Sequence, residues 1–85
     1  MNTPWFLYVV RCKDNSLYTG VTTDVDRRLF EHNSSKRGAR YTRYRRPIKL
    51  VYWERHLDQS EAQQAEYKFK QLNKKEKERI VNDAR

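Results

Sequence analysis

The sequence predicts an α+β fold in which a small three-stranded antiparallel sheet is flanked by helices, in the order β-β-α-β-α-α. Two observations lead to this expectation. Runs of β-branched and aromatic residues between turn residues predict the strands, and apolar residues that recur at helical spacing predict the helices. The 85 residues suffice for one domain, so residues 1–85 are expected to pack one sheet layer on one helix layer.

The first two strands are expected at residues 5–12 and 17–22, joined by turn residues into an antiparallel hairpin. Side chains alternate along a strand, so Tyr8 shares a face of its strand with Val10, and Tyr18 shares a face of its strand with Gly20. A glycine weakens a strand interior. Gly20 therefore indicates that another backbone or a ligand approaches closely there.

The first helix is expected to begin at Thr23, because Thr23 and Asp26 resemble a capping box. It fades over residues 33–35 and places Arg28 and His32 four residues apart on one side. A loop with at most one short helical turn follows. The third strand is expected at residues 48–54.

Two helices are expected after the third strand. Ser60 is predicted as the N-cap of the first of them, with Gln63 completing a capping box. Its buried stripe consists of apolar residues at helical spacing, namely Ala62, Ala65, Phe69 and Leu72. Asn73 is expected to end this helix, and residues 74–81 form a short polar last helix.

The charge balance indicates a polyanionic partner. Nineteen Lys and Arg against eleven Asp and Glu give a net charge of +8 and a pI near 9.9, which favours nucleic acid, with DNA expected before RNA. No acidic residue lies between His32 and Trp53. The residues expected to contact nucleic acid are Arg27, Lys36, Arg37, Arg40, Tyr41, Arg43, Arg45 and Arg46. The alternative is that charge merely keeps this loop solvated.

The remaining composition argues against other classes. Cys12 is the only cysteine, which excludes an internal disulfide and a zinc site built from cysteines. In its apolar run Cys12 is expected to be a buried hydrophobe rather than a nucleophile. We find no signal-peptide pattern and no run of roughly 20 apolar residues. A cytoplasmic protein that does not contact membranes is expected.

The hairpin and the helices carry motifs that together resemble the GIY-YIG nuclease superfamily. Phe6-Leu7-Tyr8 and, ten residues later, Tyr18-Thr19-Gly20 resemble its paired triplets. Arg28 follows Tyr18 by ten residues, His32 follows Arg28 by four, and Glu66 stands five residues after Glu61. The resemblance covers nearly the whole chain, and residues 17–33 are similar to the stand-alone bacterial subfamily. Phe6 and Leu7 depart from the Gly and Ile of the family name.

The resemblance implies an endonuclease that uses one divalent metal, Mg²⁺ or Mn²⁺. Glu66 would hold the metal against the scissile phosphate, and Arg28 would bind phosphate oxygens. Tyr8 would be the general base, Tyr18 would position water or share the proton, and His32 would relay the proton or bind phosphate. The implied catalytic residues are expected to converge on one face of the sheet.

The residues alone leave other interpretations open. Tyrosines in strands commonly form the edge of a core, Arg28 could pair with Glu31, and Glu66 could pair with Lys70. Helical spacing does not select Glu66 over Glu61, so that choice rests on the resemblance. The first hypothesis is a nuclease acting on branched or damaged DNA, in repair. The alternatives are a non-catalytic DNA- or RNA-binding module that retains the fold, and a basic RNA- or ribosome-associated protein. A protein partner or self-association could supply specificity.

Overall fold

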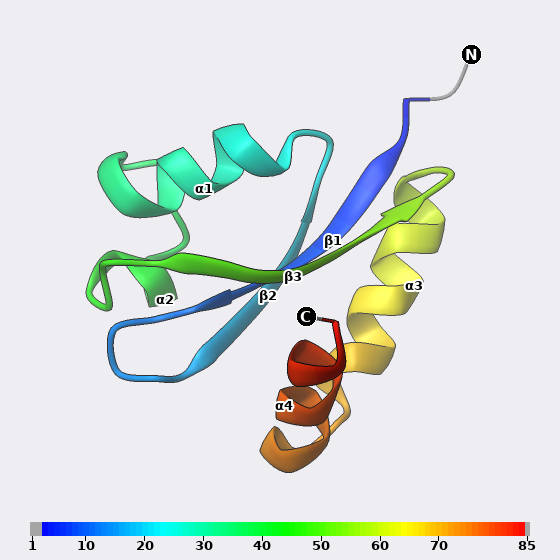
Figure 1. Cartoon of the computed structure of the whole chain (residues 1–85). Helices are drawn as coiled ribbons and strands as arrows, with labels where there is room; N and C mark the ends of the chain where they lie inside the picture. The colour runs from blue at the N-terminus through cyan, green and yellow to red at the C-terminus, as the bar shows by residue number, and fades with distance from the viewer. Residues whose placement is uncertain (1–2, 85) are drawn as a thin grey trace.

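The sheet matches the predicted one. In the structure of the chain, a computed structural model that describes residues 3–84, three antiparallel strands lie in the order β2-β1-β3 (Figure 1). They are β1 (Trp5–Arg11), β2 (Leu17–Thr22) and β3 (Lys49–His56). β1 is central and its residues 7–10 are buried on both faces, which explains why its sequence is a continuous apolar run instead of an alternating one.

Helices cover both faces of the sheet, so the expectation of one helix layer is wrong. One face carries α1 (Val25–Ser34) and the short α2 (Arg40–Arg43), and the other carries α3 (Gln59–Lys70) and α4 (Lys74–Asp83) (Figure 1). Two separate clusters form the core. Leu7 and Val9 pack beneath α3 and α4, whereas Tyr8 and Val10 pack beneath α1.

Both predicted N-caps are displaced along the chain. α1 is capped by Asp24, not Thr23, and the Asp24 side chain accepts the Arg27 backbone N–H at 3.0 Å. α3 is capped by Asp58, not Ser60, and the Asp58 side chain accepts the Glu61 N–H at 2.9 Å. Asp caps a helix as well as Ser or Thr does, so the choice among neighbouring capping residues depends on where the chain turns out of the preceding strand.

The C-terminal end of α1 is fastened to the segment that leads into β3. The Asn33 side chain donates to the Ile48 carbonyl at 2.9 Å and accepts the Ile48 N–H at 2.7 Å. Arg46 donates to the carbonyl oxygens of His32 and Ser35, both at 2.6 Å. These bonds satisfy carbonyl groups that the helix end leaves without partners, and they fix where α1 ends over the sheet.

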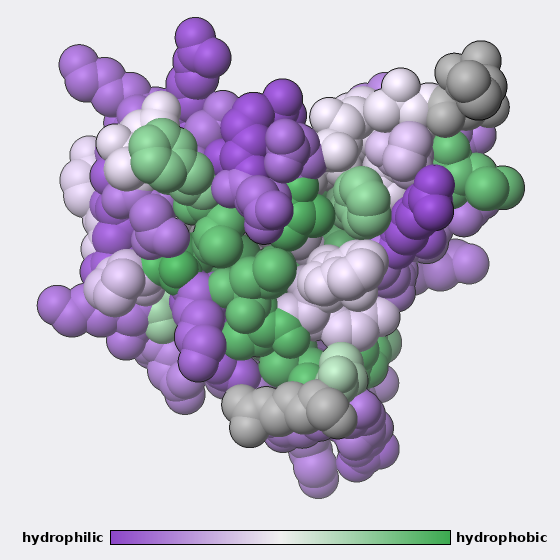
Figure 2. Space-filling view, turned by 45° about the horizontal axis from the view of Figure 1, so that its top comes forward, coloured by the Kyte–Doolittle hydropathy of each residue, from purple (hydrophilic) through white to green (hydrophobic). Residues whose placement is uncertain are grey.

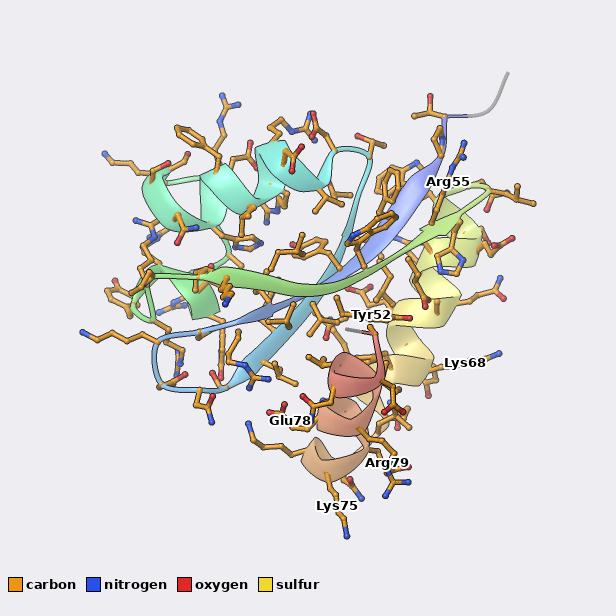
Figure 3. All side chains as sticks on the ribbon, in the orientation of Figure 1. Tyr52, Arg55, Lys68, Lys75, Glu78 and Arg79 are labelled. Carbon is orange, nitrogen blue, oxygen red and sulfur yellow. The ribbon has the colours of Figure 1, made fainter. Side chains whose placement is uncertain are left out.

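The last helix is tied to the central strand by an ion pair. α3 ends at Lys70 with Gln71 as its C-cap, before the predicted end at Asn73. Asn73 instead caps α4 through a capping box with Glu76. The Arg11 guanidinium donates to both oxygens of Glu78, at 2.8 and 2.6 Å, and this pairing lowers the pKa of Glu78 to about 2. Figure 3 shows Lys75 on the part of α4 that points away from the sheet.

One face of the molecule carries apolar side chains among hydrophilic ones. Figure 2 shows apolar side chains gathered in a strip on the displayed face, bordered by hydrophilic side chains. Within residues 3–84, no helix is long and apolar enough to cross a membrane. Cys12 is 4% exposed, consistent with a packing role.

Gly20 owes its place to a side chain. Tyr8 and Gly20 are cross-strand partners, and the Tyr8 ring lies over Gly20, where a Cβ would come within 2.5 Å of the Tyr8 hydroxyl oxygen and 2.7 Å of Cζ. The close neighbour of Gly20 is the Tyr8 side chain and not another backbone segment. The absence of a side chain at position 20 lets the Tyr8 hydroxyl extend over β2, the edge strand.

Gly20→Ala should therefore displace the Tyr8 hydroxyl and destabilise the fold by about 1–3 kcal/mol, the usual cost of overpacking. Chemical denaturation would measure the change in the free energy of unfolding. The matched control is the same substitution in a Tyr8→Ala background, where the clash is absent and the added methyl group should cost little. Equal costs in both backgrounds would contradict the proposed clash.

Candidate active site

The Tyr8 hydroxyl meets a buried imidazole on the α1 face of the sheet. The Tyr8 oxygen lies 2.7 Å from His32 Nε2, and the two ring centroids are 5.6 Å apart. Tyr8 is 2% exposed and His32 is 0% exposed. The strand and helix positions predicted for these residues thus bring them into direct contact.

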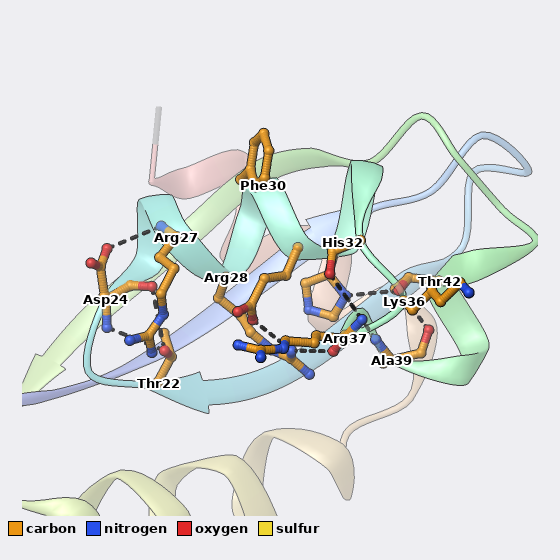
Figure 4. A network of polar contacts seen from close by, with 12 residues as sticks. Thr22, Asp24, Arg27, Arg28, Phe30, His32, Lys36, Arg37, Ala39 and Thr42 are labelled. Atoms are coloured by element: carbon orange, nitrogen blue, oxygen red, sulfur yellow. Dashed lines mark hydrogen bonds and ion pairs between the residues drawn. The ribbon is translucent and has the colours of Figure 1, made fainter.

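The second nitrogen of His32 is held by residues that the sequence did not single out. Thr42 Oγ1, from α2, lies 2.7 Å from His32 Nδ1, and the Ala39 N–H lies 3.3 Å from the same nitrogen (Figure 4). The Thr42 hydroxyl is also 2.9 Å from the Ala39 carbonyl. Thr42 is completely buried. Its only sequence signal is that it is a small uncharged residue within a basic segment.

Two placements of the hydrogens fit these distances. In the first, Tyr8 donates to Nε2, Nδ1–H donates to Thr42, and Thr42 donates to the Ala39 carbonyl, which leaves the Ala39 N–H facing Nδ1–H without an acceptor. In the second, Thr42 and the Ala39 N–H donate to Nδ1, and Nε2–H donates to the Tyr8 oxygen. In both, the imidazole is held from two sides by partners that fix its orientation.

Tyr18 stands next to His32 in a column of packed rings. Its ring contacts His32 edge-on, with centroids 5.4 Å apart, and stacks on Tyr41 at 5.9 Å. The Arg45 guanidinium covers the Tyr41 ring at 3.8 Å and pairs with Asp14 at 3.0 Å. Tyr41 and Arg45 thus support Tyr18, and any contact they make with nucleic acid remains a prediction.

Arg28 lies at the entrance to this pair of rings. Its Nη1 donates to the Glu31 carboxylate at 2.9 Å and to the Arg37 carbonyl at 2.6 Å (Figure 4). The expected alternative, an ion pair with Glu31, is therefore present. Both bonds use the same nitrogen, and the guanidinium also lies within hydrogen-bonding range of the Tyr8 hydroxyl. A guanidinium carries five N–H groups, so those that remain can serve a phosphate.

Glu66 approaches from the other layer. Four of the predicted residues share the α1 face, whereas Glu66 belongs to α3, which departs from the expectation of a common face. α3 packs beside β2 and β1, and Figure 4 shows it running along β2. The negative charge of Glu66 raises the pKa of Tyr8, so the two groups interact electrostatically around this edge. Glu66 also pairs with Lys70 at 3.2 Å.

Burial keeps the central pair neutral. It raises the pKa of Tyr8 to about 12, although the Arg28 guanidinium acts in the opposite direction. It lowers the pKa of His32 to about 4, and here the positive charge of Arg28 acts in the same direction. At neutral pH Tyr8 is therefore a phenol and His32 an uncharged imidazole with one nitrogen able to accept a proton.

The donor set near Tyr8 suits a metal that is completed by substrate. Among residues 3–84, no group of three or more His, Cys, Asp and Glu side chains could hold a metal. Mg²⁺ retains several waters and is commonly bound by one or two carboxylates together with substrate phosphate. The Glu66 carboxylate fits this pattern, because its side chain is 23% exposed and its pairing with Lys70 is a weak surface contact.

Apart from Tyr41 and Arg45, the predicted nucleic-acid-binding residues fall into two groups. Arg46 caps α1 with its guanidinium, and Arg43 donates to the Lys36 carbonyl at 3.0 Å, so both have roles within the fold. Arg27, Lys36, Arg37 and Arg40 are exposed. Within residues 3–84, no side-chain hydrogen bond or ion pair engages their charged groups.

Comparison with known proteins places these features in a family. The family described as "GIY-YIG catalytic domain" matches residues 4–79. The chain is 56% identical over 77 residues to UPF0213 protein DP2720 of Desulfotalea psychrophila, covering 91% of this chain and 70% of that relative. It is 52% identical over 79 residues to UPF0213 protein YhbQ of Escherichia coli, covering 93% and 78%.

A solved structure agrees with these relatives. The chain resembles the solution structure of UPF0213 protein BH0048 from Bacillus halodurans, with a TM-score of 0.60 and 44% identity over 93% of this chain and 83% of that one. The family match spans the hairpin, α1 and α3, which carry the residues described above. The chain belongs to the GIY-YIG nuclease superfamily.

Proposed function

We propose that this protein is a divalent-metal-dependent endonuclease that hydrolyses phosphodiester bonds in DNA, and that Tyr8, Tyr18, Arg28, His32 and Glu66 form its active site. The observation that carries the proposal is the 2.7 Å contact between the Tyr8 hydroxyl and His32 Nε2. It lies within the electrostatic reach of one guanidinium and one carboxylate. A nuclease needs a proton acceptor, a cation and a metal ligand around one phosphate.

The neutral pair suggests how the proton moves. A phenol with a pKa of about 12 is a poor base by itself at neutral pH. In the arrangement where Tyr8 donates to His32, the Tyr8 oxygen can take a proton from the attacking water while its own proton passes to Nε2. The water oxygen then bonds to phosphorus, the bond to the leaving oxygen breaks, and its electron pair stays on the leaving oxygen as a negative charge. The positive charge of the transferred proton ends on the imidazole, and Tyr8 stays a phenol.

The other residues have supporting roles in the proposal. Arg28 would hold non-bridging phosphate oxygens with its free N–H groups. Tyr18, fixed between His32 and Tyr41, would orient the attacking water. A metal bound at Glu66 would act as a Lewis acid on the phosphate. Exposed Arg27, Lys36, Arg37 and Arg40 would hold the flanking backbone.

Substitution of the metal ligand should separate a nuclease from a binding module. Glu66→Gln should abolish cutting while DNA binding is kept, because binding does not need the metal. Tyr8→Phe should lower the rate by roughly 10²–10⁴-fold. Glu61→Gln, on the same helix, is the control and should cut like wild type. Supercoiled, nicked, branched and single-stranded DNA would be tested with Mg²⁺, with Mn²⁺ and with chelator.

Two outcomes would overturn this assignment. Wild-type protein that binds DNA but cuts none of these forms would favour the non-catalytic binding module. Cutting that survives in Glu66→Gln would mean that the carboxylate is misassigned.

The protonation state of His32 gives a second test. Only two histidines are present, so both can be followed by NMR titration. His32 should stay neutral until the pH falls toward 4. Burial lowers the pKa of His56, but hydrogen bonds to Glu54 and Glu61 outweigh this and raise the pKa above its usual value, so His56 is an internal control whose pKa shifts in the opposite direction. A midpoint near 6.5 for His32 would contradict the buried pair.

The same shift links His32 to stability. The unfolded state protonates this imidazole near pH 6.5 and the folded state near pH 4, so the unfolded state binds more protons between these values. Stability should therefore fall by about 3 kcal/mol as the pH drops through this window. The decrease attributable to His32 should be absent in His32→Gln.

Salt dependence tests the proposed phosphate contacts. Neutralising Lys36, Arg37 and Arg40 together should flatten the slope of log affinity against log salt on duplex DNA, by up to roughly 0.9 for each phosphate that these side chains neutralise. The matched control neutralises Lys68, Lys75 and Arg79, which lie on α3 and α4 (Figure 3) and should leave the slope almost unchanged. Equal slopes in both triple variants would mean that the segment with Lys36, Arg37 and Arg40 is only a solvated loop.

A further inference from the structure

An exposed tryptophan lies beside the proposed active site, and its contacts within the fold do not account for its exposure. Trp53 is the cross-strand partner of Tyr8, so both side chains project from the same face of the sheet. Tyr8 extends toward β2, and Trp53 lies on β3, the opposite edge. The side chain of Trp53 remains 56% exposed, although burying it would stabilise the fold.

An irregularity in β3 places Leu50 on the same face as Trp53. The register with β1 shifts between Val9 and Val10, so that Tyr8 pairs with Trp53 and Val10 pairs with Leu50. In a regular strand, residues 50 and 53 would point to opposite faces. The extra residue places both on the α1 face. Bulges are frequent next to active sites, where they redirect a side chain.

Trp53 lines a cavity of about 360 Å³ between β3 and the start of α1. Phe6 contacts the indole edge-on, with ring centroids 5.9 Å apart. Besides these two rings, the lining residues are Thr23, Asp24, Val25, Asp26 and Leu50. An open aromatic wall of this kind suits a flat apolar ring.

The charges around the cavity determine which kind of flat ring it can bind. Asp24 and Asp26 stand at the α1 side of the cavity and repel phosphate, so the sugar–phosphate backbone would not lie there. Carboxylates accept hydrogen bonds from the exocyclic amino groups of bases. Arg55 pairs with Phe6 in the register and is exposed on the same face, where it can meet the phosphate of the same nucleotide (Figure 3).

We infer that this cavity binds an unpaired base of the substrate, stacked on Trp53, and that bases with an exocyclic amino group bind better than thymine. The inference rests on the proposed function, which it deepens. A base can reach the cavity only when it is not paired. The substrate class is therefore nucleic acid with a single-stranded segment adjoining the cut site, and not uninterrupted duplex.

Intrinsic fluorescence tests this without any cutting. In a Trp5→Phe background Trp53 is the only tryptophan. With chelator present, a short oligocytidine deoxynucleotide should quench Trp53 on binding, oligothymidine should bind more weakly, and duplex of equal length should quench little. Trp53→Ala, followed by anisotropy of a labelled oligonucleotide, should weaken single-strand binding by roughly 5- to 150-fold, the range measured for stacked bases.

Matched variants define the controls. Tyr67→Ala removes another exposed aromatic, which lies on α3, and should bind like wild type. Asp26→Asn should remove the preference for cytosine over thymine while keeping the quenching. Binding without quenching, or Trp53→Ala that binds single strands like wild type, would overturn the inference. So would quenching that grows with protein concentration when no DNA is present, since that would identify the face as a contact between copies.

The outcome separates the two proposals. Quenching by oligocytidine in a protein that cuts no DNA would retain the base site and refute the nuclease. Metal-dependent cutting with unchanged single-strand affinity in Trp53→Ala would retain the nuclease and refute the base site.

Discussion

The contact between the Tyr8 ring and Gly20 determines where the chemistry can occur. Because position 20 has no side chain, the ring lies over β2 and its hydroxyl reaches both His32 and the electrostatic range of Glu66. Any larger residue at position 20 would push the hydroxyl away from both. The glycine of the second triplet and the tyrosine of the first thus form one structural unit. This explains physically why the two motifs occur on paired strands.

Much of the fold follows from local signals, because strands rich in β-branched and aromatic residues and amphipathic helices are encoded over short stretches. The errors in the caps arose where the answer depended on distant residues. Asp24 and Thr23 are both good caps, and the preceding strand decides between them. The expectation of a single helix layer overlooked that the continuous apolar run of the first strand is typical of a strand buried on both faces. For the site, the positions predicted for Tyr8 and His32 bring the two side chains together. Thr42 has only a weak signal in the sequence, because its contact with His32 exists only once α2 folds against α1.

The charged residues around α1 differ between the start of the helix and the segment after its end. Asp24 and Asp26 lie at its start, and exposed Lys36 and Arg37 follow its end, while Arg28 and His32 lie between them. A helix of ten residues is roughly 15 Å long, about the span of a few nucleotides. On the proposed function, phosphates would be held by Lys36 and Arg37 beyond the end of the helix and by Arg27 in its first turn, while an unpaired base would be held in the cavity beside Asp24 and Asp26. The scissile bond would lie between these contacts, near Arg28 and His32.

This arrangement couples substrate binding to the proton acceptor. Desolvation is the first cause of the low pKa of His32, and the positive charge of Arg28 is the second. A phosphate that pairs with Arg28 would cancel that second cause and add a negative charge nearby, and both effects raise the affinity of the imidazole for a proton. Tyr8 would become harder to ionise under the same charge, so a mechanism through a free phenolate would be hindered by its own substrate. Concerted transfer through Tyr8 to His32 avoids this conflict, because Tyr8 is never left charged. The buried, neutral pair of Tyr8 and His32 is therefore better suited to transferring a proton than to keeping Tyr8 deprotonated as a base.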